Sequence, residues 1–175
     1  MVCLAETNVP WHKNIFLYNV NKQNQITWKN MPVKTIAASC RRTRHTSPNY
    51  QPGGCLSIVT NTLTTKIKSS TSDYLGRWTR VNFFAKKGTV AIYTLYCPNK
   101  SSIRHTGGDT VWMQQQQVLE KEKDKEEPRY QLILDLIKDI QDSQQHQHTE
   151  VTILGDFNED PRDEEENGIN MLMTA

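Results

Sequence analysis

Short apolar runs rich in Val, Ile, Thr, Tyr, Trp and Phe recur through the first part of the chain and predict β-strands. One run opens with Gly53-Gly54, and the last two runs are separated by Lys87-Gly88, which is typical of a hairpin turn. The predicted strands cover residues 2–7, 53–60, 77–84 and 89–97.

The period of the pattern then changes from strand to helix. Pro128 suits the first position of a helix, and the apolar residues after it fall at helical spacing: Leu132, Ile133, Leu136, Ile137 and Ile140. The polar residues 114–127 before it predict a solvated helix that ends in a loop. Residues 151–154 return to a short apolar strand.

Residues 20–52 show little periodicity and many Asn, Gln and Lys, so we expect a large surface loop there. A chain of 175 residues is of ordinary single-domain size and is long enough for a hydrophobic core. We therefore treat residues 1–175 as one domain of strands followed by a helix and one more strand.

Candidate chemistry begins where the last predicted strand ends, at Gly155-Asp156-Phe157-Asn158. In extended backbone, side chains two positions apart point the same way, so Asp156 and Asn158 would converge while Phe157 turns into the core. An acid and an amide placed in this way suit a phosphate, or a water held for attack on one. The alternative is a strand leading into a turn, since Gly, Asp and Asn are common turn formers.

Composition narrows the class of protein. With 36% hydrophobic residues and no apolar run of about 18 residues, the sequence predicts no membrane span. Its first residues lack the basic region and apolar core of a signal peptide, so we expect an intracellular protein that is not secreted. The four cysteines lie far apart, which argues against a zinc site or a disulfide framework: Cys3, Cys40, Cys55 and Cys97.

Charge is distributed unevenly along the chain. Residues 1–110 hold 15 Lys or Arg against 3 Asp or Glu, a balance of +12, whereas residues 111–175 hold 6 against 16, a balance of −10. Such asymmetry predicts a polyanionic partner, and backbone phosphates of a nucleic acid would meet basic side chains of this kind. Solvated loop charges are the alternative. The basic side chains concerned are Arg41, Arg42, Arg44 and His45, and downstream Arg77, Arg80, Lys86, Lys87, Lys100 and Arg104.

Three motifs in this order resemble those of the endonuclease/exonuclease/phosphatase superfamily, the DNase I-like metal-dependent phosphodiesterases. They are Cys-Leu-Ala-Glu-Thr-Asn at residues 3–8, Tyr-Cys-Pro-Asn at residues 96–99, and Gly-Asp-Phe-Asn at residues 155–158. The glycine-led strand, the helix from Pro128 and the start of a helix at residues 168–172 are similar to further parts of that family. The resemblance implies an α/β fold of the α+β sandwich type, with two packed β-sheets flanked by helices.

The resemblance also implies roles for particular residues. Glu6 would bind the metal, Mg²⁺ with Mn²⁺ as the alternative, because hard cations prefer carboxylate oxygen. Tyr96 and Asn99 would lie near the scissile phosphate, and Asp156 and Asn158 would be catalytic. Substrate phosphates would be met by the basic residues Arg41, Arg42, Arg44 and Arg104.

The Gly-Gly strand, the Gln-rich stretch after Thr110 and the Gly-Asp-Phe-Asn-Glu string are similar to retroelement endonuclease domains. This similarity implies nucleic acid, most directly DNA, as the partner. The sequence carries no sign of a protein partner. It predicts a metal-dependent phosphodiester hydrolase of the endonuclease type.

Two motifs of that family have no counterpart in the chain. The family's metal-binding Asn precedes the Glu motif, and its Asp-His pair follows Gly-Asp-x-Asn, yet no His lies after Asn158. We therefore expect a partial domain, truncated at both ends, with activity lowered by about 10²- to 10⁴-fold. The alternatives are an inactive fragment or relic that at most binds nucleic acid, and a phosphatase of the same fold that acts on an inositol phosphate or a lipid head group.

Overall fold

The structure, a computed structural model, describes residues 1–40, 49–99, 110–123, 126–145, 148–159, 162 and 168–174. Their strands form one three-stranded and one four-stranded sheet. The three-stranded sheet is antiparallel, in the order β1 (Val2–Leu4), β3 (Cys55–Thr60) and β2 (Val33–Ala38).

The four-stranded sheet is mixed. Its strands follow the order β4 (Ile67–Ser72), β5 (Trp78–Ala85), β6 (Gly88–Tyr96) and β7 (Thr149–Asp156). The first three are antiparallel neighbours, whereas β7 runs parallel to β6. A parallel neighbour requires a crossover connection, and the chain makes it through α2 (Val111–Lys121) and α3 (Pro128–Gln144).

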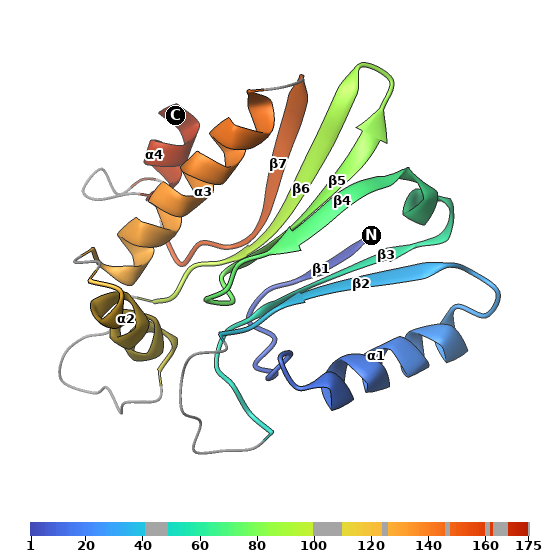
Figure 1. The fold of residues 1–175 in the computed structure, drawn as a ribbon, viewed down its shortest axis with the longest axis horizontal. Helices are drawn as coiled ribbons and strands as arrows, with labels where there is room; N and C mark the ends of the chain where they lie inside the picture. The colour runs from blue at the N-terminus through green and yellow to red at the C-terminus, as the bar shows by residue number, and fades with distance from the viewer. Residues whose placement is uncertain are drawn as a thin grey trace.

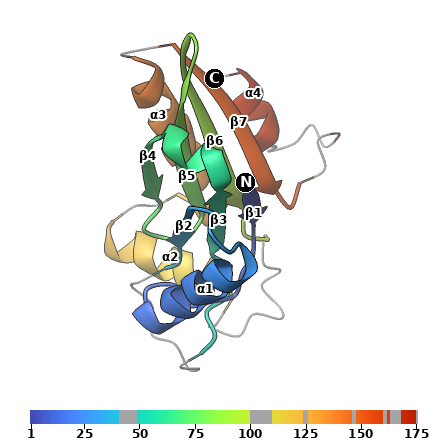
Figure 2. The same ribbon diagram turned by 90° about the vertical axis from the view of Figure 1, so that its right-hand side faces the viewer.

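The sheets and helices form layers. α1 (Asn14–Thr27) covers the outer face of the three-stranded sheet, and α3 covers the outer face of the four-stranded sheet (Figures 1 and 2). Between the sheets, Ile36 and Val59 of one pack against Val81 and Phe83 of the other. The remaining elements, the 3₁₀ helix η1 (Asn61–Lys66) and α4 (Gly168–Thr174), lie at the periphery.

A second buried contact joins the sheets through hydroxyl groups. Ser57 on β3 lies 2.7 Å from the hydroxyls of both Thr79 on β5 and Thr94 on β6. All three residues are at most 1% exposed. Because each hydroxyl finds a partner, the interface carries polar side chains without leaving them unsatisfied.

The outline expected from the sequence is confirmed. Two sheets with helices make an α+β fold, the predicted strands exist, and a two-residue turn joins Ala85 to Gly88. Pro128 occupies the first turn of α3, whose buried face includes Leu132, Ile133 and Leu136. The first strand is shorter than expected, since it ends at Leu4.

The expectation of a surface loop at residues 20–52 is wrong. α1 and β2 occupy much of it, while residues 41–48 lie outside the described residues. The helix escaped notice because it buries no residue completely; Phe16 and Val20 pack only partly against the sheet. Strand β4 was also missed, since its Ile-Lys-Ser-Ser-Thr-Ser sequence lies at a sheet edge and needs few apolar residues.

The expectation of a helix followed by a loop at residues 114–127 is confirmed, but the helix is not solvated on all sides. α2 begins at Val111 and its buried residues are Gln114, Gln115, Val118 and Leu119. Two of these are glutamines, so a hydrophobic pattern alone could not identify the packed face. Within the described ranges, no helix is both long and apolar enough to cross a membrane.

Candidate active site

Several strands present their ends at one end of the sandwich, where the candidate residues lie. β6 and β7 finish side by side, with Tyr96 paired to Asp156 in the register of the parallel sheet. β1 finishes opposite the start of β3, since Leu4 pairs with Leu56. The edge strands β1 and β7 also contact each other. This arrangement brings together three segments that are distant in sequence.

Glu6 projects from the loop that follows β1. The backbone of Glu6 has φ 51° and that of Asn8 has φ 56°, left-handed values that end the strand. Asn8 then fastens the loop to the Gly-Gly segment: its N–H donates to the Gly53 carbonyl at 2.8 Å, and its Oδ1 accepts from the Gly53 N–H at 2.9 Å. Glu6 is exposed on a loop held at both sides.

Tyr96 lies beneath this loop and is 5% exposed. Its ring packs with Cys55 and Ala38. Gly53, at φ +80°, makes room for it, because a Cβ there would lie 3.4 Å from the ring and 3.1 Å from Val111. The Gly-Gly pair is therefore explained by close packing at the end of the sandwich.

The pKa of the Tyr96 hydroxyl depends on the carboxylates near it. Its pKa is raised above the ordinary tyrosine value, first by burial and then by the negative charges of Glu6 and Asp156. A hydrogen bond between the Tyr96 hydroxyl and the Glu6 carboxylate raises it further. The structure therefore brings Glu6, Tyr96 and Asp156 to one place, and Tyr96 keeps its proton as a hydrogen-bond donor.

Asp156 and Asn158 do not converge in the way that extended backbone predicts. The strand ends at Asp156, Asn158 has φ 50°, and the Asp156 Oδ1 accepts the Asn158 N–H at 3.0 Å. This is a local turn closed by the aspartate side chain. Asn158 instead donates through Nδ2 to the Cys97 carbonyl at 2.7 Å. Phe157 packs against the hydrophobic core, as expected.

Two residues that sequence reasoning missed hold this loop. Arg129, in the first turn of α3, pairs with Glu159 at 2.6 Å and donates to the carbonyls of Phe157 and Asn158. Glu159 also accepts the N–H of Ile169 at 3.0 Å. Glu159 belongs to the Gly-Asp-Phe-Asn-Glu string, but nothing in the sequence indicates that its partner is Arg129.

The other predicted site residues are either exposed or outside the described residues. Asn99 is exposed on the loop after β6. The proposed phosphate-contacting residues Arg41, Arg42, Arg44 and Arg104 lie outside the described residues.

The expectation that Arg77 and Arg80 meet phosphate is wrong. The side chain of Arg77 is 1% exposed and pairs with Asp73 and Asp135. Arg80 pairs with Asp139 at 2.6 Å. Both guanidinium groups are committed to carboxylates inside the fold, so they are structural.

The thiols near the site are buried. Cys55 is fully buried and Cys97 is 1% exposed. Burial raises the pKa of Cys97 to about 12. The negative charges of Glu159 and Asp156 also raise it, whereas the positive charge of Arg129 lowers it. Both cysteines are neutral near neutral pH and behave as small hydrophobic residues.

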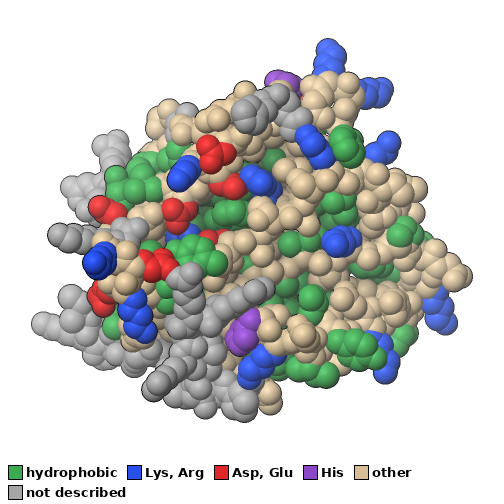
Figure 3. Space-filling model, in the orientation of Figure 1, with side chains coloured by type: hydrophobic (Ala, Val, Ile, Leu, Met, Phe, Trp, Pro, Cys, Tyr) green, Lys and Arg blue, Asp and Glu red, His purple; other side chains and the backbone are tan. Residues whose placement is uncertain are grey.

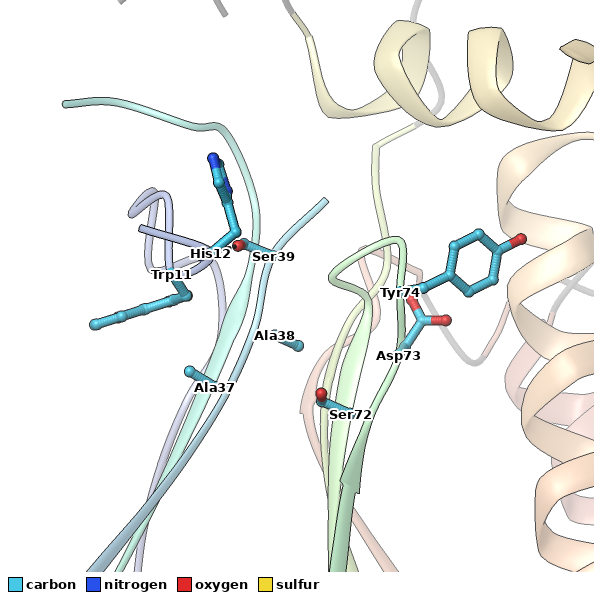
Figure 4. Close-up of a pocket in the computed structure, with 8 residues that line it drawn as sticks. All are labelled: Trp11, His12, Ala37, Ala38, Ser39, Ser72, Asp73 and Tyr74. Carbon is cyan, nitrogen blue, oxygen red and sulfur yellow. Dashed lines mark hydrogen bonds between the residues drawn. The ribbon is translucent and has the colours of Figure 1, made fainter. Parts of the chain in front are cut away.

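A pocket of about 250 Å³ opens at the same end of the sandwich, between β2 and β4. Trp11 and His12 border it from the loop after β1, while Asp73 and Tyr74 border it from the turn after β4 (Figure 4). The carboxylate of Asp73 already accepts hydrogen bonds from Arg77. Glu6, Tyr96 and Asp156 do not line this pocket, so it is separate from their cluster.

The carboxylates fit a hard cation only in part. Glu6 and Asp156 are exposed carboxylates whose charges both act on Tyr96, and Mg²⁺ is commonly held by one or two carboxylates while it keeps several waters. No group of three or more His, Cys, Asp or Glu side chains positioned to hold a metal occurs among the residues that the structure describes. The donor set therefore suits an open, water-rich Mg²⁺ site rather than a closed metal cage.

No protein-family model matches the chain, and no curated protein of significant similarity was found.

Proposed function

We propose that this protein is a Mg²⁺-dependent phosphodiester hydrolase of the endonuclease type that acts on nucleic acid, with a DNase I-like fold. One observation carries the proposal. Glu6, Tyr96 and Asp156 come from three separate motifs, yet the two carboxylates act on the same buried tyrosine hydroxyl. Strands with purely structural ends have no need to gather two exposed carboxylates around one phenol.

Each of the four candidate residues has a separate role in the proposed hydrolysis. Glu6 would hold the metal, which when bound would supply Lewis-acid polarisation of the phosphate. Asp156 would orient the attacking water and accept its proton as the water oxygen bonds to phosphorus; the P–O bond to the leaving oxygen breaks, and that oxygen takes a proton from solvent. Tyr96, kept protonated by its raised pKa, has one hydroxyl hydrogen, which Glu6 accepts in this structure; with Glu6 on the metal, that hydrogen would turn to a phosphoryl oxygen. The Asn158 amide donates one hydrogen to the Cys97 carbonyl, and its second hydrogen would be donated to a phosphoryl oxygen of the substrate.

The charge of two sequence segments that follow described strand ends supports nucleic acid as the substrate. Residues 41–48 connect to the chain at Cys40, just after β2 ends, and residues 100–109 connect at Asn99, just after β6 ends. Both strand ends lie at the end of the sandwich that carries Glu6 and Asp156. The sequences of these two segments contain five arginines or lysines: Arg41, Arg42, Arg44, Lys100 and Arg104.

The test is nicking of supercoiled plasmid by purified protein with Mg²⁺, and with EDTA as the metal-free control. We expect nicking with Mg²⁺ and none with EDTA. E6Q and D156N should each lower it by about 10²- to 10⁴-fold. The matched control is D142N, because Asp142 is an exposed aspartate of α3; it should nick like the unmodified chain.

Two outcomes would overturn this proposal. Nicking that survives D156N would show that another residue or a contaminant is responsible. Salt-sensitive DNA binding without any nicking would leave a nucleic-acid-binding relic, and release of phosphate from an inositol phosphate in place of nicking would indicate a phosphatase.

A further inference from the structure

The other end of the sandwich carries a second concentration of positive charge. Lys66 ends η1, Lys68 lies on β4, and Lys86 and Lys87 form the turn between β5 and β6. All four side chains belong to exposed residues. Figure 3 shows basic side chains gathered at the upper right, over the β5–β6 hairpin of Figure 1, without acidic side chains among them.

An aromatic ring lies within this group. Phe84 is 59% exposed, although its neighbour Phe83 is a 5% exposed core residue. The ammonium group of Lys68 lies 6.0 Å from the centre of the Phe84 ring. Phe84 thus differs from other exposed aromatic residues in having its ring beside lysines.

Strand register places these residues together. Ile67 pairs with Phe83 in the antiparallel sheet, so Lys66 lies beside Phe84. Ala85 pairs with Gly88, so Lys86 and Lys87 follow directly at the hairpin tip. We call Lys66, Lys68, Phe84, Lys86 and Lys87 the hairpin patch.

Acidic residues do not neutralise the hairpin patch from its own elements. η1, β4, β5 and β6 contain no Asp or Glu. On β7, Glu150 is aligned with Val90 and Phe83, so it projects toward the opposite face of the sheet from Phe84. Glu150 also has His148 as its neighbour at 3.7 Å.

We propose that the hairpin patch binds single-stranded nucleic acid, with phosphates on the lysines and a base stacked on Phe84. Lysines meet backbone phosphates without regard to sequence, and exposed aromatic rings stack on unpaired bases. Stacking requires an unpaired base, which a duplex does not offer. A single exposed phenylalanine is too little apolar surface for membrane insertion. This surface lies at the opposite end from Glu6 and Asp156, and it works without hydrolysis.

The test is equilibrium binding of a labelled oligodeoxythymidylate to the full chain in EDTA, over a series of salt concentrations. F84A should weaken binding about 5- to 150-fold, the loss associated with one stacked base. Its matched control is Y18A, because Tyr18 is a 63% exposed aromatic residue of α1, on the outer side of the other sheet. Y18A should bind like the unmodified chain.

The lysines are tested through the dependence of binding on salt. K86Q/K87Q should reduce the slope of log K against log salt by about 1.4, at about 0.7 for each phosphate contact to a single strand. K22Q/K29Q removes two exposed lysines at α1 and should leave the slope unchanged. An oligonucleotide that carries 5-iodouracil should crosslink on illumination to the peptide that contains Phe84.

The proposal is wrong if F84A and K86Q/K87Q bind like their controls, or if the crosslink maps elsewhere. It is also wrong if the chain binds vesicles with phosphatidylserine through the hairpin patch while the oligonucleotide does not compete. D156N separates this surface from the candidate active site, since it should lower nicking by about 10²- to 10⁴-fold and preserve the effect of F84A on binding.

Discussion

At the scale of single residues, Tyr96 is the point where the three motifs meet. Its hydroxyl is buried, hydrogen-bonds to the Glu6 carboxylate and lies within the influence of the Asp156 charge. Each of these effects favours the neutral phenol. Gly53 next to it has φ +80°, which favours glycine, and a Cβ there would lie 3.1 Å from Val111. One hydroxyl thus links the geometry of the strand ends to the electrostatics of the candidate site.

We predict that E6Q lowers the pKa of Tyr96, because it removes a negative charge that disfavours the phenolate. The measurement is the ultraviolet absorbance of phenolate against pH, with the trace of the same chain carrying Y96F subtracted so that only Tyr96 remains. E150Q, at the far end of β7, should leave the Tyr96 transition where it is. An unchanged transition in E6Q would contradict the proximity of the two residues.

The same pKa has a consequence for stability. Folding raises the pKa of Tyr96 above its unfolded value of about 10, so its contribution to stability is complete below that pH. The contribution is lost as pH rises above about 10. Urea unfolding should therefore show a smaller loss of stability at alkaline pH in Y96F than in the unmodified chain.

At the scale of elements, α3 connects the core to the candidate site. Its buried face packs on the four-stranded sheet, while Arg129 in its first turn holds the loop after β7. Because the helix is the crossover between the parallel strands β6 and β7, its packing determines where Asp156 lies relative to Tyr96. Loosening the helix should therefore affect both stability and the site.

We predict that L136A lowers the free energy of unfolding by about 2 to 5 kcal/mol, because Leu136 is fully buried and its truncation leaves a cavity. The control on the same helix is L134A, since Leu134 is 36% exposed, and its effect should stay within about 1 kcal/mol. Urea unfolding measures both. Equal losses in the two variants would mean that α3 does not pack through this face.

At the scale of the whole molecule, two sheets pack through apolar side chains at one point and through hydroxyls at another. Ile36, Val59, Val81 and Phe83 form the apolar contact. The Ser57 hydroxyl forms the polar one by reaching both Thr79 and Thr94. A polar group buried between sheets is tolerated when it is hydrogen-bonded, and it also favours one relative position of the sheets.

We predict that S57A lowers the free energy of unfolding by about 1 to 3 kcal/mol, because it leaves two buried threonine hydroxyls without their partner. S70A, on the exposed part of β4, should change it by less than about 0.5 kcal/mol. Urea unfolding of both variants tests whether the hydroxyl contact holds the sheets. A neutral S57A would show that water or another group replaces the serine.

Local sequence determined the elements whose apolar residues have a clear period. The Pro128 helix and the β5–β6 hairpin follow from spacing and turn chemistry, since both signals act within a few residues, although the turn is Lys86-Lys87 rather than Lys87-Gly88. α1, β4 and the packed face of α2 could not be recognised in this way. Their contacts use few apolar residues, or buried glutamines, and only the surrounding fold makes those positions interior.

For the candidate site, the sequence identified three residues at or just after strand ends: Tyr96 and Asp156 end β6 and β7, and Glu6 follows β1. Their meeting was decided by tertiary structure, because strand order and register bring positions up to 150 residues apart to one end of the sandwich. Tertiary structure also decided against local expectation at Asn158, which turns toward Cys97, and at Arg77, whose charge is buried against Asp73. Spacing along a chain describes neighbours within an element, whereas partners across elements depend on packing that no local pattern encodes.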